Sequence, residues 1–306
     1  MPPPGGEQIS ETPLVSLVCC GLIGTTVADD GMVDRAYSEA IATQGVVTGT
    51  TAYARCMAQV HRSRGRAPID VLQSLFPESQ ARAQAAQLAF DRSFSAAVDR
   101  SGVTAVPGAE QSIARLTEMG ARVCLVTGFS RRVLGLVLDT LGWWDRVDLA
   151  ICPDDVPRGC PAPDLVLSAM LRLGVQDVRD TAVAQGTESG VLSGKRSGAG
   201  IVAGVLTGIH TKDRLHRAGA SHLLDSIADL PDLLSATWGG GPERVAASAS
   251  ASVSAADGSP DQMRLPVPAQ AAAAEPGASP APSGPAGQAD DATRPRVPLE
   301  RRSAGL

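Results

Sequence analysis

Three short segments rich in glycine and threonine have the residue types that hold an anion. They are residues 20–26 (Cys-Gly-Leu-Ile-Gly-Thr-Thr), 127–131 (Thr-Gly-Phe-Ser-Arg) and 185–190 (Gln-Gly-Thr-Glu-Ser-Gly). Glycine lets the backbone approach a ligand closely, and the threonine hydroxyl adds a hydrogen-bond donor. One such turn is a weak signal. Three of them, each after an apolar strand-like run, predict a single anion-binding cleft.

The elements around these segments alternate between strand-like and helix-like runs. Strands are expected over residues 14–20, 121–127, 147–152, 181–184 and 201–206, and helices over 110–119, 130–141, 163–173, 188–197, 212–218 and 226–236. This alternation predicts an α/β fold with a doubly wound, mostly parallel sheet of five or more strands. Ligands bind such sheets beyond the carboxyl ends of the strands, at the point where the strand order reverses. The three segments are therefore expected to meet there.

A long insertion separates the first expected strand from the rest of the sheet. It contains only helical patterns, at Val33–Thr43, Tyr53–Ser63, Ile69–Leu75 and Gln80–Arg100. We expect a helical cap domain over residues 30–104, and a core made of residues 13–29 and 105–238. Residues 1–12 and the Ala/Pro/Ser/Gly-rich residues 239–306 are expected to be disordered, because they contain too little apolar surface to offset the entropy of ordering.

The composition narrows the class of protein. The chain has 306 residues, of which 43% are hydrophobic and 3% aromatic, and its formal net charge is −5. The acidic balance argues against a nucleic-acid surface, and no apolar run is long enough to cross a bilayer. Pro2, Pro3, Pro4 and Glu7 stand where a secretory signal would be positively charged, so a cytoplasmic location is expected. The six cysteines form no Cys-x-x-Cys pair and are expected to be reduced core residues.

The three segments, in this order, resemble motifs of the haloacid dehalogenase (HAD) hydrolases, especially the phosphonatase-like and phosphoglycolate phosphatase-like branch. Gly24-Thr25-Thr26 is similar to the turn after the family's nucleophile, and Val126-Thr127-Gly128 to the motif that binds phosphate. The resemblance covers about residues 14–236. It implies a Rossmannoid core with a helical cap inserted after the first strand. It also implies that Thr127 and Gly128 bind phosphate.

The residues that carry the family's chemistry are missing from these motifs. Gly21 stands where the family has its Asp nucleophile, and Ile23 where it usually has an acid/base. Gly186 and Gly190 stand at the metal-binding Asp positions of a Gly-Asp-Thr-x-x-Asp motif. The family's aspartate attacks phosphorus, and its carboxylates hold Mg²⁺. We therefore expect no intact catalytic residue, no intact metal site and no cofactor here, although Mg²⁺ is the family's metal.

The region 154–164 resembles the family's third motif, which usually contains Gly-Arg-Pro. Cys160 occupies the basic position, and Arg158 is expected to reach the same phosphate. The phosphonatase subgroup also uses a cap lysine to form a Schiff base with its substrate. No lysine precedes Lys195 in this chain, so the resemblance implies that this mechanism is absent.

Several residues are candidates to replace the missing carboxylates. Cys20 should point away from the side that Gly21 faces, because neighbours on a strand face opposite sides. Asp29 and Asp30 could approach a metal, although solvated linker acids or helix caps are the plainer interpretation. Glu188 fits a helix start, where the dipole favours a carboxylate. His61, in the basic run 59–66, could lie over the cleft or simply end a cap helix.

These observations favour a HAD-like hydrolase homologue that has lost phosphoryl transfer and binds a small anionic or phosphorylated ligand. Two alternatives stay open. One is an active Mg²⁺-dependent phosphatase of small metabolites that uses a substitute carboxylate. The other is a non-catalytic interaction protein that recruits a partner through its cap or tail. Neither nucleic acid nor a membrane is an expected partner.

Overall fold

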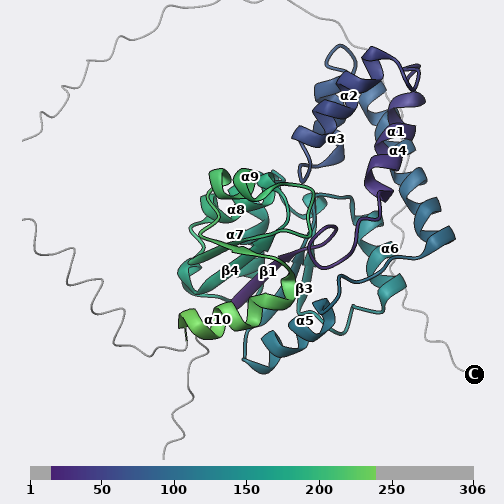
Figure 1. Cartoon of the computed structure of the whole chain (residues 1–306). Coiled ribbons are helices and arrows are strands. Elements are labelled where there is room, and N and C mark those ends of the chain that lie inside the picture. The colour runs from purple at the N-terminus through teal and green to yellow at the C-terminus, as the bar shows by residue number, and fades with distance from the viewer. Residues whose placement is uncertain (1–14, 239–306) are drawn as a thin grey trace, which may run out of the picture. The chain divides into compact units, whose positions relative to one another are not determined.

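Six parallel strands form the centre of residues 15–238, the part of the chain that the computed structural model describes (Figure 1). Their order is β3-β2-β1-β4-β5-β6. The strands are β1 (Leu17–Gly21), β2 (Arg122–Val126), β3 (Leu149–Ile151), β4 (Thr181–Gln185), β5 (Ile201–Val205) and β6 (His222–Leu224). The predicted α/β class and doubly wound sheet are confirmed. The predicted sheet of five or more strands allowed for a sixth, but β6 was not among the strands named, since Leu223 and Leu224 are only a two-residue apolar run in the sequence.

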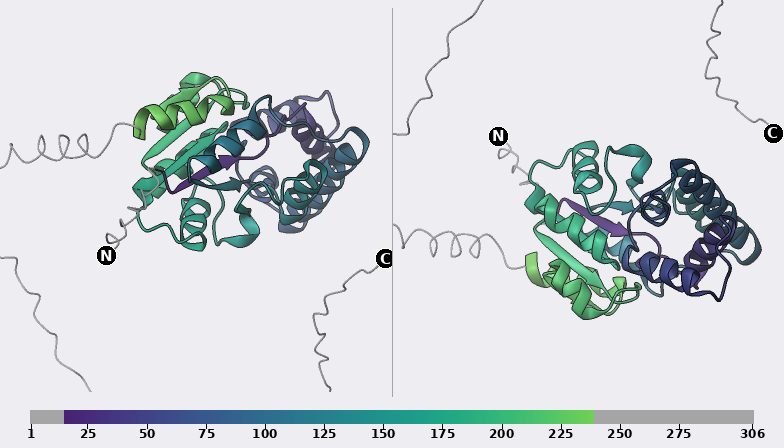
Figure 2. Two further views of the ribbon diagram at one scale, coloured as in Figure 1. Left: turned by 90° about the horizontal axis from the view of Figure 1, so that it is seen from below. Right: turned by 90° about the horizontal axis from the view of Figure 1, so that it is seen from above.

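The central strand β1 is apolar along its whole length because both faces of the sheet are covered. Val18 and Cys20 face a core that includes Ile113, Leu116 and Leu234, from helices on one side. Leu17 and Cys19 face the opposite core, with Leu165, Val166 and Ala169. The views in Figure 2 show the sheet lying between these two layers of helices.

The helices of the core follow the strands closely. They are α5 (Ala109–Glu118), α6 (Arg131–Leu141), α7 (Asp164–Arg172), α8 (Glu188–Ser197), α9 (Lys212–Ala218) and α10 (Leu230–Trp238). Two of them begin at hydroxyl side chains that cap free backbone N–H groups. Ser130 accepts a hydrogen bond from the backbone N–H of Val133, and Thr187 accepts one from that of Gly190. The segments after β2 and β4 therefore turn directly into helices at the same edge of the sheet.

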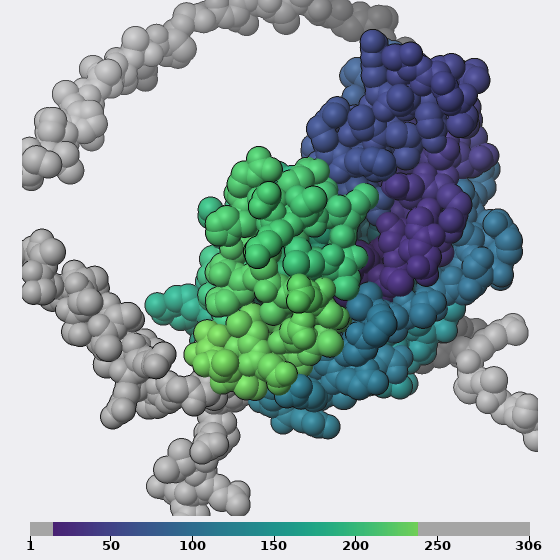
Figure 3. Space-filling model, viewed as in Figure 1, coloured from purple at the N-terminus to yellow at the C-terminus, as the bar shows by residue number. Residues whose placement is uncertain are grey.

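Four helices form the cap that is inserted after β1: α1 (Met32–Ala42), α2 (Thr51–Arg62), α3 (Pro68–Leu75) and α4 (Gln80–Ser101). An aromatic cluster joins the cap to the core. The ring of Phe129, which follows β2, lies 5.9 Å from that of Phe90 and 5.7 Å from that of Phe94, both on α4. In the space-filling view the purple and blue cap surface meets the teal and green core surface (Figure 3).

The predicted disordered segments, residues 1–12 and 239–306, lie outside the described residues. None of the helices within residues 15–238 combines the length and the apolar character that crossing a membrane requires.

Candidate ligand site at the carboxyl end of the sheet

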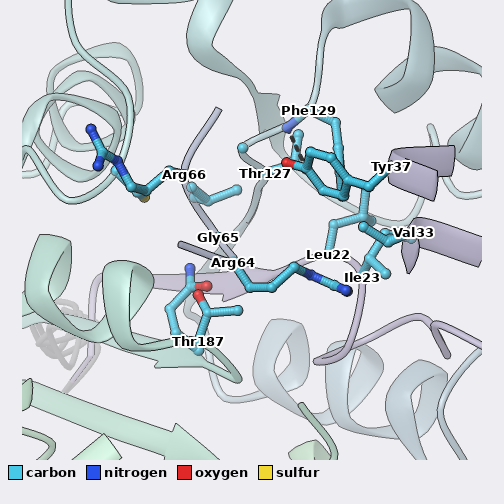
Figure 4. Close-up of a pocket in the computed structure, with 14 residues that line it drawn as sticks. Leu22, Ile23, Val33, Tyr37, Arg64, Gly65, Arg66, Thr127, Phe129 and Thr187 are labelled. Carbon is cyan, nitrogen blue, oxygen red and sulfur yellow. Dashed lines mark hydrogen bonds between the residues drawn. The ribbon is translucent and has the colours of Figure 1, made fainter. Parts of the chain in front are cut away.

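A small cavity lies where the segments leaving β1, β2 and β4 meet beneath the cap (Figure 4). Its volume is about 50 Å³, which is room for about four water molecules. The core contributes Leu22, Ile23, Val126, Thr127, Gly128, Phe129, Cys160, Gln185 and Thr187, and the cap contributes Val33, Tyr37, Arg64, Gly65 and Arg66. The site therefore lies at the point where the strand order reverses, between β1 and β4.

Hydrogen bonds hold the three core segments together. The hydroxyl of Thr26 donates to the carbonyl of Gly21 at 2.9 Å, and the backbone N–H of Gly186 donates to the hydroxyl oxygen of Thr25 at 3.0 Å. Both threonine side chains are buried. The threonines of the first segment thus fix its turn and tie it to the segment after β4.

Thr127 and Gly128, the predicted phosphate-binding residues, both line the cavity. The Thr127 hydroxyl oxygen accepts a hydrogen bond from the backbone N–H of Phe129 at 3.2 Å, shown as a dashed line in Figure 4. That bond uses the oxygen as an acceptor, so the hydroxyl proton is free to donate to a ligand. Ile23 also reaches the wall, as an apolar side chain at the family's acid/base position.

Arg158 is not brought to this cavity. It lines a separate outer cleft of about 500 Å³, and its side chain is 70% exposed. Its Nε and Nη2 donate to the two carboxylate oxygens of Asp164 at 3.1 and 2.8 Å. These bonds hold the pKa of the Asp164 carboxyl below its ordinary value. The predicted meeting of Arg158 with Thr127 and Gly128 is therefore absent from this arrangement.

Two arginines of the cap line the inner cavity instead. Arg64 is 7% exposed, and its Nη1 and Nη2 each lie 2.5 Å from a carboxylate oxygen, of Asp34 and Asp29 respectively. Arg66 is exposed, makes no ion pair within residues 15–238, and lines both the cavity and the outer cleft. The sequence placed both arginines in the basic run 59–66 but could not show that this run covers the cleft.

Gln185 fills the space beside Gly190, and Gln185 and Thr25 together fill the space beside Gly21, where a Cβ atom would lie 2.6 Å from Thr25 Oγ1. A Cβ atom on Gly190 would lie 2.5 Å from Gln185 Oε1, and a Cβ atom on Gly21 would lie 2.6 Å from the same oxygen. Gly186 is crowded differently, since its Cβ atom would lie 2.7 Å from the backbone oxygen of Gly24 and 2.8 Å from Gly208 Cα. Real Cβ atoms do not approach other atoms so closely, so none of these positions accepts an aspartate without rearrangement.

The residues present do not fit the Mg²⁺ that the family's chemistry requires. Mg²⁺ is held through carboxylate and other oxygen ligands in near-ideal octahedral geometry. Throughout residues 15–238, no three His, Cys, Asp or Glu side chains gather in a group able to hold a metal ion. Glycines 21, 186 and 190 supply no ligand side chain.

The side chains weighed as substitutes are engaged elsewhere. Cys20 is fully buried in the hydrophobic core, and burial raises the pKa of its thiol far above the ordinary value. Asp29 pairs with Arg64 and accepts a hydrogen bond from the backbone N–H of Val33 at 3.0 Å. Asp30 is exposed, and Glu188 accepts a hydrogen bond from Arg214 Nε at 3.0 Å.

The cap segment 61–66 rests directly on the start of α8. The Ser189 hydroxyl donates to the carbonyl of Arg64 at 2.7 Å, and His210 Nε2 lies 3.2 Å from the carbonyl oxygen of His61. His210 Nδ1 accepts a hydrogen bond from the backbone N–H of Glu188 at 2.7 Å. Burial lowers the pKa of His210, which favours the neutral ring that these two bonds require.

Comparison with known proteins agrees with this geometry. Residues 24–198 match the family model of haloacid dehalogenase-like hydrolases. A phosphonoacetaldehyde hydrolase of Bordetella avium is 29% identical over 153 residues, which cover 42% of this chain and 55% of that protein. The corresponding protein of Parabacteroides distasonis is 25% identical over 153 residues, covering 42% and 57%. The chain therefore aligns with about half the length of these relatives.

Solved structures of similar fold cover most of the described residues. A hydrolase from Pseudomonas syringae superposes with a TM-score of 0.62 at 22% identity, covering 71% of this chain and 96% of that one. A phosphonoacetaldehyde hydrolase-like protein from Oleispira antarctica gives 0.64 at 20% identity, covering 74% and 93%. At these identities the structures establish the fold alone. Together with the matched family model, they show that this chain belongs to the haloacid dehalogenase-like hydrolase family, as the resemblance of its motifs predicted.

Proposed function

We propose that this chain is a member of the family that has lost phosphoryl transfer and binds a small oxyanion in the cavity beneath its cap. The observation that carries the proposal is the filled cleft floor. The Gln185 side chain occupies the space beside Gly190 and shares with Thr25 the space beside Gly21, the two positions where the motifs of the family have carboxylates. Loss of a nucleophile alone lowers rates by several orders of magnitude in other hydrolases, and loss of metal ligands adds to that.

No other side chain of the cavity is ready to act as a nucleophile. Cys160 is the only thiol among the lining residues, and burial raises its pKa to about 11, so it is a neutral thiol near pH 7. The Thr127 hydroxyl has no general base among its hydrogen-bond partners in the described residues. The cavity therefore supports binding better than covalent chemistry.

The polar groups of the cavity support an oxyanion as the ligand. Thr127 and Gln185 offer donors, and the guanidinium groups of Arg64 and Arg66 contribute positive charge. Arg64 has five N–H donors, and the two closest contacts with Asp29 and Asp34 leave others available. A volume of about 50 Å³ suits an ion of the size of phosphate. A larger ester would require the cap to move.

The activity named for the aligned relatives, phosphonoacetaldehyde hydrolysis, is not proposed for this chain. The mechanism implied by the resemblance needs a lysine in the cap. The two lysines here are Lys195 and Lys212, on α8 and α9 of the core. The alternative of an active phosphatase requires a free carboxylate at the cleft floor, and Asp29 is instead paired with Arg64.

Two measurements test the proposal. In the first, phosphate release from a panel of small phosphate esters and phosphonoacetaldehyde is followed with Mg²⁺, and no release above the buffer rate is expected. In the second, inorganic phosphate is titrated by calorimetry. Binding is expected in the millimolar range or tighter, and Thr127→Val should weaken it about tenfold by removing one donor to a charged ligand.

A matched control is Thr140→Val on the exposed face of α6, which should leave phosphate binding unchanged. Mg²⁺-dependent turnover by the unaltered chain would overturn the loss of phosphoryl transfer. Absence of phosphate binding at millimolar concentration would overturn the assignment of the cavity.

A further inference from the structure

Gln185 fills the cleft floor in a way that suggests a new role for this position. We propose that its carboxamide has replaced the family's metal site as the group that receives the ligand, so that the cavity recognises a tetrahedral oxyanion such as phosphate without a metal. The inference rests on the proposed function, because it specifies which group of the same cavity binds the ion. It extends that function by assigning recognition to a residue at which the motif of the family has glycine.

The first argument is steric. All three nearest neighbours of a Cβ atom on Gly190 would belong to Gln185: Oε1 at 2.5 Å, Cδ at 2.8 Å and Cγ at 2.9 Å. A Cβ atom on Gly21 would also lie 2.6 Å from Oε1. A glutamine at 185 in this conformation therefore excludes a side chain at 190 and, together with Thr25, one at 21. The glutamine at 185 and the glycine at 190 are sterically linked.

The second argument concerns hydrogen bonding. Gln185 is 7% exposed and lines the cavity. Its carboxamide makes no hydrogen bond to any group within residues 15–238, although neighbouring polar groups such as Thr25 and Thr187 are bonded. A carboxamide that borders a cavity and has no partner in the protein is usually satisfied by water or a ligand. The amide has two N–H donors for that purpose.

The third argument is the position of the amide relative to the other donors. Gln185 ends β4, and Thr127 directly follows β2, on either side of β1. Both side chains reach the same cavity of about 50 Å³. A tetrahedral ion there can accept hydrogen bonds from Thr127 on one side of β1 and from Gln185 on the other. In the family's chemistry a metal neutralises the phosphoryl oxygens at this place, and here two neutral donors and the nearby arginines serve instead.

A double-mutant cycle tests the steric argument by thermal unfolding. Gly190 lies in the first turn of α8, where alanine is intrinsically the better helix former. Gly190→Ala should lower Tm in the unaltered chain, because its methyl group meets Gln185. In the Gln185→Ala background the same change should raise Tm by about 2–4 °C. Gly135→Ala on α6, where a Cβ atom meets nothing within 4 Å, should raise Tm equally in both backgrounds.

Calorimetry with inorganic phosphate tests the binding argument. The dissociation constant should be the same in EDTA and in excess Mg²⁺. Gln185→Ala should raise it about tenfold, and Gln185→Glu should raise it further through repulsion of the ion. Gln176→Ala, at an exposed glutamine outside the cavity, should leave it unchanged. Titration with glycerol phosphate separates recognition of the free ion from recognition of an ester.

The outcomes separate this inference from the proposed function. Equal effects of Gly190→Ala in both Gln185 backgrounds, or phosphate binding that Gln185→Ala leaves unchanged, would overturn the role of Gln185 while leaving the cavity as a binding site. Phosphate binding that requires Mg²⁺ would overturn metal-free recognition. Turnover of phosphate esters by the unaltered chain would overturn the proposed function itself, whatever the cycle shows.

Discussion

At the scale of single residues, the cleft floor has no empty space beside the glycines that stand at the family's carboxylate positions. Gly21 and Gly190 adjoin a buried glutamine, and Gly186 adjoins the backbone of Gly24 and Gly208. Protein interiors are packed as densely as organic crystals, so a vacated position is taken over by its neighbours. Introducing aspartate at these three positions alone therefore cannot recreate the family's site.

This packing predicts the result of a repair experiment. The triple variant Gly21→Asp/Gly186→Asp/Gly190→Asp should be destabilised by several kcal/mol, because overpacking costs about 1–3 kcal/mol at each site. It should show no heat of Mg²⁺ binding. Adding Gln185→Gly should recover part of the stability by clearing the space beside residue 190 and one of the two closest contacts at residue 21. Urea unfolding and Mg²⁺ calorimetry on both variants check this.

The clash that remains at residue 186 predicts the stability of the quadruple variant. Its Cβ atom would still meet backbone atoms, so the quadruple variant should stay less stable than the unaltered chain. This packing argument would be contradicted by a triple variant that is as stable as the unaltered chain and whose affinity for Mg²⁺ equals that of the quadruple variant.

The residues of this site could be identified from the sequence, but the direction of the Gln185 side chain could not. Comparison with the motifs of the family shows glycine at 21, 186 and 190, where the family has carboxylates. Gln185 was equally visible, one position before Gly186. The direction of its side chain, toward Gly21 and Gly190, depends on the register of β4 against β1, which is a property of the folded structure.

At the scale of elements, the strands and helices could be predicted because their patterns are local. Apolar runs predicted β1, β2, β4 and β5 to within a few residues, and the helical spacing of apolar residues predicted α6. The strand order also predicted that the three core segments meet, but it did not predict how the cap contacts the core. The placement of segment 61–66 on α8 depends on hydrogen bonds between residues more than 100 positions apart, such as Ser189 to Arg64.

His210 makes this contact sensitive to pH. Its pKa is lowered chiefly by burial, and Arg214 and Arg64 lower it further, against the opposing effects of the His61 carbonyl and Glu188. A histidine whose pKa is depressed by folding stabilises fully above its unfolded pKa of about 6.5, and this stability is lost as the pH falls from there toward the folded pKa. Acidification should therefore lower Tm.

The variant His210→Gln should weaken this dependence, since a glutamine oxygen can accept the Glu188 N–H bond but does not titrate. Tm is measured between pH 8 and pH 5. The control His216→Gln, at an exposed position on α9, should leave the slope as it is. An unchanged pH slope in His210→Gln would show that other groups carry it.

At the scale of the whole molecule, the cap and the core enclose the site together. Phe129 of the core packs on Phe90 and Phe94 of the cap, while Arg64 and Gly65 of the cap form a wall of the cavity. A cavity walled by both parts changes its shape when the cap moves against the core. The strength of the contact between cap and core should therefore control access to the site.

Gly65 offers a specific way to test that contact. It has φ +87°, and a Cβ atom there would lie 2.2 Å from Thr187 Oγ1 and 2.7 Å from Thr187 Cβ. Gly49 has a similar φ of +84°, but a Cβ atom there would meet nothing within 4 Å. Both alanine variants carry the same backbone strain of about 1–2 kcal/mol, but only Gly65→Ala pushes the cap segment away from α8.

Gly65→Ala should therefore lower stability by about 1–3 kcal/mol more than Gly49→Ala does, which is the usual cost of overpacking. Hydrogen exchange should accelerate in segment 61–66 and in the first turn of α8, while β1 and β2 keep their protection. Phosphate should bind more weakly to Gly65→Ala than to Gly49→Ala, because Arg64 and Arg66 move with the segment. Equal stability losses and equal exchange in the two variants would mean that the cap is held by other contacts, such as the Phe129 cluster, and that segment 61–66 does not control the site.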